Sequence, residues 1–217
     1  MKLKNLLKND IPTINHNTSG NMALLIMEEY KTSHLIVLSE ANFKGILNQD
    51  AILEMEDLTN EISTILNQAK NISLNTTDHI CIALKTFSEH KVSIIPIFDE
   101  IKYCGYITIA DVIYKIGEPY QLTEIGILTI KCTIENYSLS EISRLIEQNK
   151  GKVISSFVQI IPDSKNIYVD IIVNQKNLTR IIKSLERFKW NVVETYDTSL
   201  IENLDNRFDS FLRYLNT

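Results

Sequence analysis

Residues 104–113, CGYITIADVI, contain the side-chain pair best suited to ligand binding in this sequence. Thr108 and Asp111 follow a short strand-like run and stand three positions apart where a helix-like run begins. A carboxylate accepts hydrogen bonds from two hydroxyl groups, and the N-terminus of a helix favours an anion such as phosphate. The same Ser/Thr-x-x-Asp/Glu spacing also forms a capping box, which only closes the helix end. The pair is therefore either a helix cap or part of a ligand site.

Other side chains that could act as catalysts or metal ligands are scattered along the chain. They are His16, His34, His79, His90, Cys81, Cys104 and Cys132. None of them has the spacing of a zinc site, and the sequence has no Walker A, G-x-S-x-G or H-E-x-x-H motif. We therefore expect a protein that is not an enzyme, without a metal site and with buried free thiols.

The composition is that of a globular protein without a basic face. Hydrophobic residues make up 44% and charged residues 23%, and the formal net charge is −5. Lys2, Lys4 and Lys8 form a short basic start, which we interpret as solvated, so nucleic acid is not an expected partner. No apolar run approaches the roughly 20 residues of a membrane span, and no signal peptide is evident. We expect a cytoplasmic protein with no membrane partner.

The first half of the chain repeats itself at an offset of 60 residues. Matching pairs include Ala23 and Ala83, Glu29 and Glu89, Ser33 and Ser93, and Gly45 and Gly105. The hydrophobic positions match as well, so that SHLIVL at 33–38 aligns with SIIPIF at 93–98. A repeat at a fixed offset indicates one supersecondary unit that is used twice.

Each repeat predicts the element order β-α-β-β-α. The first should contain a strand at 12–14, a helix capped by Thr18, strands at 35–38 and 43–47, and a helix at 48–53. The second should contain a strand at 72–74, a helix capped by Asp78, strands at 94–98 and 103–107, and a helix at 108–116. Helical spacing predicts the core faces Met22, Ile26, Met27 and Tyr30, and Ile80, Ala83, Leu84 and Phe87.

The repeats resemble CBS domains, and the pair resembles a Bateman module. The second repeat, at 61–118, carries the better match, with SIIPIFD at 93–99 and GYITIAD at 105–111. The first repeat, at 1–60, departs from this pattern. Ile36 stands in the place of Pro96, Asn48 in that of Thr108, and Ala51 in that of Asp111.

The resemblance implies an adenosyl ligand, such as AMP, ADP or ATP, in a cleft between the repeats. Asp111 would bind the ribose hydroxyls, Thr108 would contact ribose or phosphate, and Gly105 would let the backbone come close. The implied walls are Ile72, Ile95 and Pro96, and the implied phosphate contacts are His90 and Lys91, although Lys91 also fits a solvated charge. Because Asn48 alone can cap the first-repeat helix, the extra carboxylate of Asp111 favours a ligand and a single competent site.

The C-terminal third predicts a separate unit with the order β-α-β-β-α-β. The expected elements are strands at 127–134, 152–161, 166–173 and 190–196, and helices at 138–151 and 177–189. This is the ferredoxin-like pattern, and residues 124–197 resemble an ACT domain. The turn at 135–141 lacks the glycine of amino-acid-binding ACT domains, which favours an assembly or docking role. Gly117-Glu118-Pro119 marks the boundary before this unit, and residues 198–217 predict one more helix.

The whole chain is thus expected to be an α+β protein. By domain order it resembles the acetoin-utilisation protein AcuB family. This implies a non-catalytic regulatory protein that senses an adenine nucleotide, forms a homodimer and acts on an unidentified protein partner. The alternative is a ligand-free CBS/ACT dimerisation or interaction scaffold, since CBS pairs also serve in that role.

Overall fold

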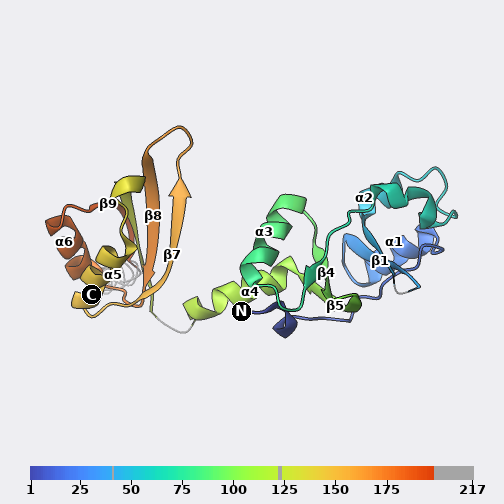
Figure 1. The fold of residues 1–217 in the computed structure, drawn as a ribbon, viewed down its shortest axis with the longest axis horizontal. Helices are drawn as coiled ribbons and strands as arrows, with labels where there is room; N and C mark the ends of the chain where they lie inside the picture. Colours follow the sequence, from blue (N-terminus) through green and yellow to red (C-terminus); the bar gives the residue numbers. More distant parts are fainter. Residues whose placement is uncertain (41, 122–123, 198–217) are drawn as a thin grey trace, which may run out of the picture. The chain divides into compact units, whose positions relative to one another are not determined.

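A computed structural model describes residues 1–40, 42–121 and 124–197 (Figure 1). The chain divides between Ile116 and Gly117 into two compact units. The first unit holds both repeats, and the second holds a four-stranded sheet with two helices. The mixed α+β class expected from the sequence is therefore observed.

The two repeats fold into hairpins whose strands pair in the same register. In the first, β1 (His34–Ser39) pairs antiparallel with β2 (Asn42–Asn48). In the second, β4 (Ile94–Asp99) pairs antiparallel with β5 (Lys102–Thr108). Both hairpins have a bulge at the same place, after Val37 and after Ile97. The offset of 60 residues read from the sequence thus corresponds to a structural repeat.

The strands expected to open each repeat are shorter than predicted. Ile14 forms only an isolated parallel bridge with Val37. Its counterpart is β3 (Leu74–Asn75), which runs parallel to β4 over two residues. Both paired segments are short, because each one borders a single strand and is soon followed by a helix.

The helices of the repeats are capped one residue later than expected. Helix α1 (Gly20–Glu29) is capped by Ser19, whose hydroxyl accepts a hydrogen bond from the Met22 amide. Helix α3 (Ile80–His90) is capped by the His79 ring. The predicted caps serve the preceding turns instead, because Thr18 and Asp78 accept hydrogen bonds from the amides of Asn15 and Asn75.

The buried faces of α1 and α3 differ in part from the predicted core faces. Ile80, Ala83 and Phe87 are buried in α3 as expected, but Leu84 is 42% exposed. In α1 the buried residues are Gly20, Ala23 and Met27, whereas Met22 and Tyr30 are 51% and 38% exposed.

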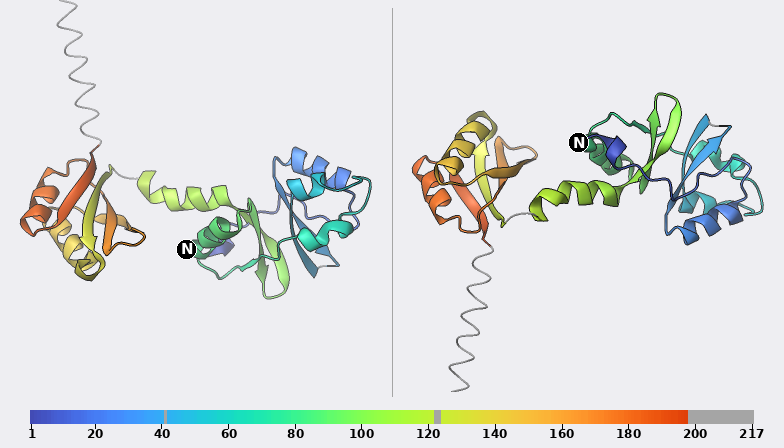
Figure 2. Two further views of the ribbon diagram at one scale, coloured as in Figure 1. Left: turned by 90° about the horizontal axis from the view of Figure 1, so that it is seen from above. Right: turned by 90° about the horizontal axis from the view of Figure 1, so that it is seen from below.

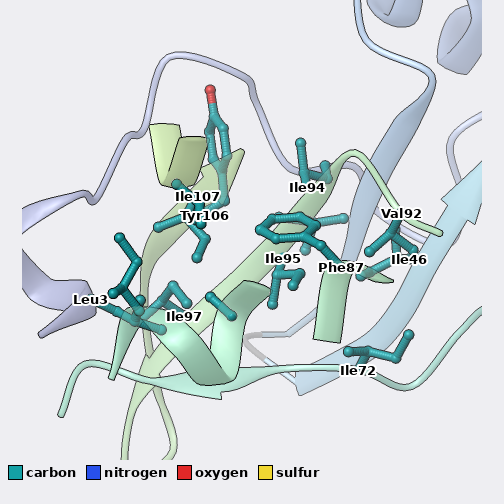
Figure 3. Close-up of a cluster of buried hydrophobic side chains, with 14 residues drawn as sticks. Leu3, Ile46, Ile72, Phe87, Val92, Ile94, Ile95, Ile97, Tyr106 and Ile107 are labelled. Carbon is teal, nitrogen blue, oxygen red and sulfur yellow. The ribbon is translucent and has the colours of Figure 1, made fainter. Parts of the chain in front are cut away.

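Each repeat is completed by a segment that precedes the other one. Residues 1–11, here called the strap, pack against the second repeat: Leu3 is fully buried in its core beside residues such as Ile97 and Ile107 (Figure 3). The linker, residues 61–70, includes the 3-10 helix η2 (Ile62–Gln68), and its Ile62 and Ile65 lie in the core of the first repeat. A short 3-10 helix, η1 (Leu3–Asn5), forms within the strap.

The last helix of each repeat follows its hairpin directly. Helix α2 (Gln49–Leu53) is short, whereas α4 (Ile109–Gln121) runs through the predicted boundary, with Pro119 inside it. A proline lacks the backbone donor, so Pro119 removes one helical hydrogen bond from the last turn of α4. The boundary signal at Gly117 therefore falls within a helix rather than after it.

The second unit has the element order β-α-β-β-α-β. Its strands are β6 (Gly126–Thr133), β7 (Val153–Ile160), β8 (Asn166–Val173) and β9 (Asn191–Asp197), in the antiparallel sheet order β7-β8-β6-β9. Its helices are α5 (Leu139–Gln148) and α6 (Thr179–Arg187), with the short 3-10 helix η3 (Ile134–Asn136) after β6. Both α-helices cover one face of the sheet (Figure 2).

Alternation along the strands explains this layer arrangement. Along β8 every second residue, from Ile167 to Val173, is buried beneath the helices. The opposite face is more polar, and there the Thr129 hydroxyl donates to the Asp170 carboxylate at 2.6 Å. Helix α5 is capped by Ser138, at the start of the predicted helix range. The helix predicted at 198–217 lies outside the described residues.

Candidate functional site

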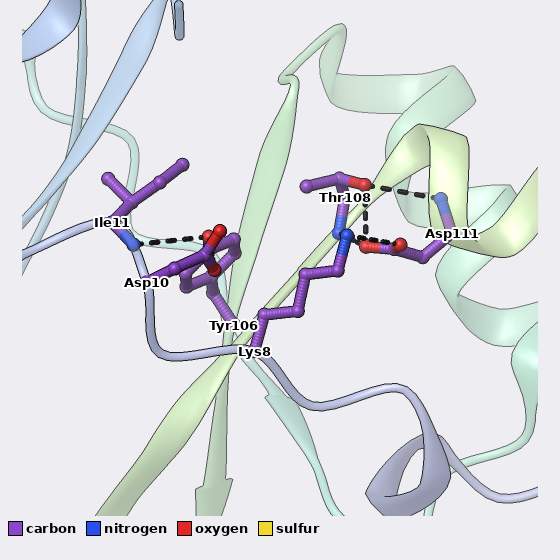
Figure 4. A network of polar contacts seen from close by, with 6 residues as sticks. All are labelled: Lys8, Asp10, Ile11, Tyr106, Thr108 and Asp111. Carbon is purple, nitrogen blue, oxygen red and sulfur yellow. Dashed lines mark hydrogen bonds and ion pairs between the residues drawn. The ribbon is translucent and has the colours of Figure 1, made fainter. Parts of the chain in front are cut away.

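The joint between β5 and α4 forms a complete capping box (Figure 4). The Thr108 hydroxyl accepts a hydrogen bond from the Asp111 amide at 3.1 Å. Asp111 Oδ2 accepts in return from the Thr108 amide at 3.1 Å and from the Thr108 hydroxyl at 2.6 Å. The cap therefore uses both side chains, so Asp111 is not an extra carboxylate beyond the cap, as the comparison of the two repeats in sequence had suggested.

A third residue, Lys8 of the strap, completes this cluster. Its Nζ lies 2.6 Å from Asp111 Oδ1, and the two side chains are 46% and 14% exposed, respectively. Burial acts to raise the pKa of Asp111, but the hydrogen bonds from Lys8 and Thr108 outweigh it and hold this pKa below its usual value. The hydrogen bond to Asp111 raises the pKa of Lys8. Lys8 was predicted to be solvated, because nothing in the sequence links it to a carboxylate 103 positions away.

The strap is held across β5 by several further bonds. The amide and carbonyl of Lys8 pair with those of Tyr106 at 2.9 and 3.0 Å. The Tyr106 hydroxyl donates to Asp10 at 2.5 Å and accepts from the Ile11 amide at 3.2 Å. Burial and the bond to Asp10 raise the pKa of Tyr106, whose side chain is almost fully enclosed. The backbone beside the Asp111 cluster is thus fixed.

Gly105 is required by the strap rather than by a ligand. Its φ is +135°, and a Cβ at this position would lie 2.5 Å from the Lys8 carbonyl oxygen and 2.7 Å from Asn9 Oδ1. The resemblance to CBS domains implies an adenosyl ligand at this close approach. In the structure, the protein's own backbone occupies the space.

The equivalent joint in the first repeat contains a lysine but has Ala51 where the second repeat has the Asp111 carboxylate. Asn48 caps α2 by accepting from the Ala51 amide at 3.1 Å. The linker residue Lys70 pairs with Ile46 as Lys8 pairs with Tyr106. With Ala51 in the place of Asp111, the Lys70 ammonium donates to the carbonyl of His90 at 2.7 Å.

The other predicted site residues are buried in the second repeat or exposed at the end of α3. Ile95 is fully buried and Ile72 is 9% exposed, both in the core of the second repeat, and Pro96 is also buried. They therefore pack inside the repeat and do not form an open wall. His90 and Lys91 are exposed at the end of α3, where Lys91 adopts a left-handed conformation as the C-cap. Gly105, Thr108 and Asp111 lie together at the β5–α4 joint, and Ile95 and Pro96 lie on the paired strand β4.

A second polar cluster lies where the two repeats meet. His34 is 9% exposed, and its Nδ1 lies 2.9 Å from the Ser93 hydroxyl and 3.0 Å from the Ser33 hydroxyl. Burial lowers the pKa of His34, and the nearby positive charge of Lys70 adds to this effect. The repeat-related serines thus meet around a neutral histidine, which we interpret as a structural contact.

The remaining predictions concern metal sites, thiols and membranes. Among residues 1–40, 42–121 and 124–197, no three histidine, cysteine or acidic side chains gather as a metal site requires. No helix in the described part of the chain has the length and apolarity to cross a membrane. The thiols are less buried than predicted: Cys81 is exposed, and Cys104 and Cys132 are half-buried. Cys81 faces outward because the buried stripe of α3 passes through Ile80 and Ala83.

A comparison with protein families matches the two repeats, which lie in the first unit. The family model of the CBS domain matches residues 3–57 and 63–118. Similar solved structures include a CBS domain pair/ACT domain protein from Thermotoga maritima, with 24% identity, a TM-score of 0.49, and coverage of 54% of this chain and 98% of that chain. A CBS-domain containing protein from Agrobacterium tumefaciens has 16% identity, a TM-score of 0.47, and coverage of 54% and 99%. No curated protein matches.

Proposed function

The chain belongs to the CBS-domain family, and from this premise we propose that it is a regulatory protein that binds an adenine nucleotide at the second repeat. The observation that carries this proposal is the cluster of Thr108, Asp111 and Lys8 at the N-terminus of α4. A carboxylate suits ribose hydroxyls, and a lysine beside a helix N-terminus suits a phosphate. The first repeat lacks the carboxylate, so we propose one site per chain.

The chemistry of the cluster defines what binding would require. Both oxygens of Asp111 already have partners, but each carboxylate oxygen accepts more than one hydrogen bond, so a ribose hydroxyl would bind Oδ1 beside the Lys8 ammonium. Thr108 would remain in the cap, with its hydroxyl close to the bound sugar. His90, Lys91, Ile72, Ile95 and Pro96 are not needed for this proposal.

A thermal-shift experiment tests this function directly. We expect AMP, ADP or ATP to raise the melting temperature of the wild-type protein, because a ligand that binds only the folded state stabilises it. Asp111→Ala should abolish the rise. Asp50→Ala, which removes an exposed carboxylate from the first turn of α2, should preserve it. No rise with any of the three nucleotides up to millimolar concentration would disprove the proposal.

The second candidate function is a ligand-free scaffold, and one observation favours it. The strap fills the space beside Gly105, and Lys8 and Thr108 satisfy Asp111, so the joint is complete without a ligand. In this case Asp111→Ala would lower stability and leave every other property unchanged. Native mass spectrometry of the purified protein distinguishes the two functions, since a co-purifying nucleotide is expected only for the sensor.

We also propose that the protein is a homodimer through the outer helix faces of the first unit. Exposed apolar side chains occur there at repeat-related positions, namely Met22 and Ile82, and Leu53 and Ile113. Contiguous exposed apolar patches mark interaction surfaces, and we propose that these four side chains form one. Light scattering after gel filtration should give the mass of a dimer for the wild type and of a monomer for the Leu53→Glu/Ile113→Glu variant. A wild-type monomer would rule the dimer out.

The second unit is proposed to be an ACT-like assembly domain. Its element order and sheet order support this assignment, and its glycine-free turn at 135–141 fits an assembly role better than amino-acid binding. Together with the CBS pair, this domain order leads us to propose kinship with the acetoin-utilisation protein AcuB family. A change in the arrangement of dimers would then carry the nucleotide signal to a protein partner.

A further inference from the structure

We propose that the second unit binds a small polyphosphate in a depression lined by Lys150, Arg180 and Lys183, here called the basic depression. It has a volume of about 580 Å³ and lies where α5 ends and α6 begins. Small-molecule sites usually have volumes of roughly 300–1,000 Å³. The turn at 135–141 lies at the other end of α5, and all lining residues belong to the second unit. This inference therefore concerns a site separate from the proposed nucleotide site.

The charge of the basic depression indicates an anionic ligand. Arg180 and Lys183 stand one turn apart on α6, and Lys150 comes from the turn that follows α5. No carboxylate among the described residues lines the depression. All three cations are exposed, and none of them forms an ion pair within residues 1–40, 42–121 and 124–197. Three positive charges around one depression favour a ligand with at least two negative charges.

Two lysines just outside the depression are neutralised by the protein itself. Lys152 pairs with Glu147 at 2.8 Å, and Lys176 pairs with Glu124 at 3.1 Å. Carboxylates are thus available at this end of the unit, but they contact the neighbouring lysines instead of the cations of the depression. The uncompensated positive charge therefore lies in the depression itself.

The two turns that form the depression are joined by side-chain amides. Gln175 Nε2 donates to the Asn149 carbonyl at 3.3 Å, and Asn149 Nδ2 donates to the Leu145 carbonyl at 2.8 Å. The Lys150 amide donates to the Glu147 carbonyl at 2.9 Å, and Lys150 adopts a left-handed conformation with a φ of +64°. The backbone that carries the cations is therefore held in place by the protein's own hydrogen bonds.

The neutral donors at the start of α6 suit phosphate groups. Asn177 Oδ1 accepts a hydrogen bond from the Thr179 amide at 3.0 Å, which leaves Asn177 Nδ2 as the donor end of the same side chain. Both side chains line the depression. The first amides of a helix also lack carbonyl partners within the helix and favour phosphate. Two or three linked phosphates can contact these donors and the cations at the same time.

Calorimetric titration of the full chain with inorganic triphosphate at low salt tests the inference. We expect one triphosphate per chain in the wild type, with an affinity that falls as salt is added. Arg180→Gln/Lys183→Gln should weaken binding at least about tenfold, which corresponds to the loss of one charge-assisted hydrogen bond. Lys150→Asn should weaken it as well, because it removes the cation of the other turn and asparagine tolerates the left-handed conformation.

Arg187→Gln is the matched control. It removes the same charge from the last turn of the same helix, outside the basic depression. It should leave the affinity for triphosphate unchanged, and so should Asp111→Ala in the second repeat. Thermal melts of the unliganded variants verify that each protein is folded.

The outcomes separate a site from a general effect of charge. Absence of triphosphate binding to the wild type overturns the inference, and so does equal weakening by Arg187→Gln, because the effect would then be one of net charge. Loss of binding in Asp111→Ala would assign the anion to the second repeat and overturn it too. Citrate, which carries three carboxylates, should bind more weakly than triphosphate. Equal binding of the two would indicate an unselective anionic contact and overturn the assignment to polyphosphate.

Discussion

The two repeats share a backbone arrangement but differ in the side chains at one joint. Both hairpins pair in the same register, and in both a lysine on an incoming segment lies beside the glycine of the second strand. Only in the second repeat does that lysine meet a carboxylate, Asp111, whereas Ala51 stands at the equivalent place in the first. Asn48 closes α2 without a carboxylate, whereas the cap of α4 uses both Thr108 and Asp111. The comparison thus shows one backbone arrangement closed by two different sets of side chains.

The largest effect should come from breaking the exchange of segments between the repeats. Leu3→Ala removes a fully buried side chain from the core of the second repeat and should lower the free energy of unfolding by about 2–4 kcal/mol. Hydrogen exchange should show faster opening of α3 than of α1. Faster opening of α1 alone would mean that the strap belongs to the first repeat.

The next largest effect should come from replacing the glycine that the two repeats share. Gly45 and Gly105 have φ values of +137° and +135°, and a Cβ at either would lie closer than 3 Å to the incoming segment. Gly45→Ala and Gly105→Ala should each destabilise the protein by about 2–3 kcal/mol in urea unfolding. If one of the two substitutions had only a mild effect, the strap and the linker would not be structurally equivalent.

A smaller effect should come from giving the first repeat a carboxylate at the position equivalent to Asp111. Ala51→Asp places a carboxylate at the start of α2, within reach of Lys70 by analogy with Asp111 and Lys8. A double-mutant cycle with Lys70→Met should give a coupling free energy of about 0.5–1 kcal/mol that decreases in high salt. Zero coupling would show that the linker holds Lys70 in a different place from Lys8.

The smallest effect is a pH dependence that belongs to the second repeat. The pKa of Asp111 is lower in the folded protein, so its contribution to stability is complete above the ordinary value of 3.8 and is lost as the pH falls through the folded pKa. The stability difference between wild type and Asp111→Asn, measured by urea unfolding, should therefore narrow in that range. A difference that stays constant with falling pH would contradict the ion pair with Lys8.

The sequence predicted the local features of the fold better than its long-range contacts. Periodicity and spacing located the hairpins, the helices and the capping pair at Thr108, because these depend on neighbours within a few residues. The spacing could not show that Asp111 is shared between a cap and a distant lysine. The role of Lys8 and the strap around Gly105 depend on pairings nearly one hundred residues apart, which a single sequence does not encode locally.

The exchanged strap has a consequence for synthesis of the protein. The bonds between Ile11 and Tyr106 and between Asp10 and Tyr106 span 95 and 96 positions, so the strap leaves the ribosome long before its partners exist. At the usual 5–20 residues per second this delay is roughly 5–20 s. During that interval the core that buries Leu3 has not yet formed, so the apolar side chains of the strap remain exposed on the nascent chain. The second repeat can therefore reach its native state only after its own C-terminal strand has emerged to receive the strap.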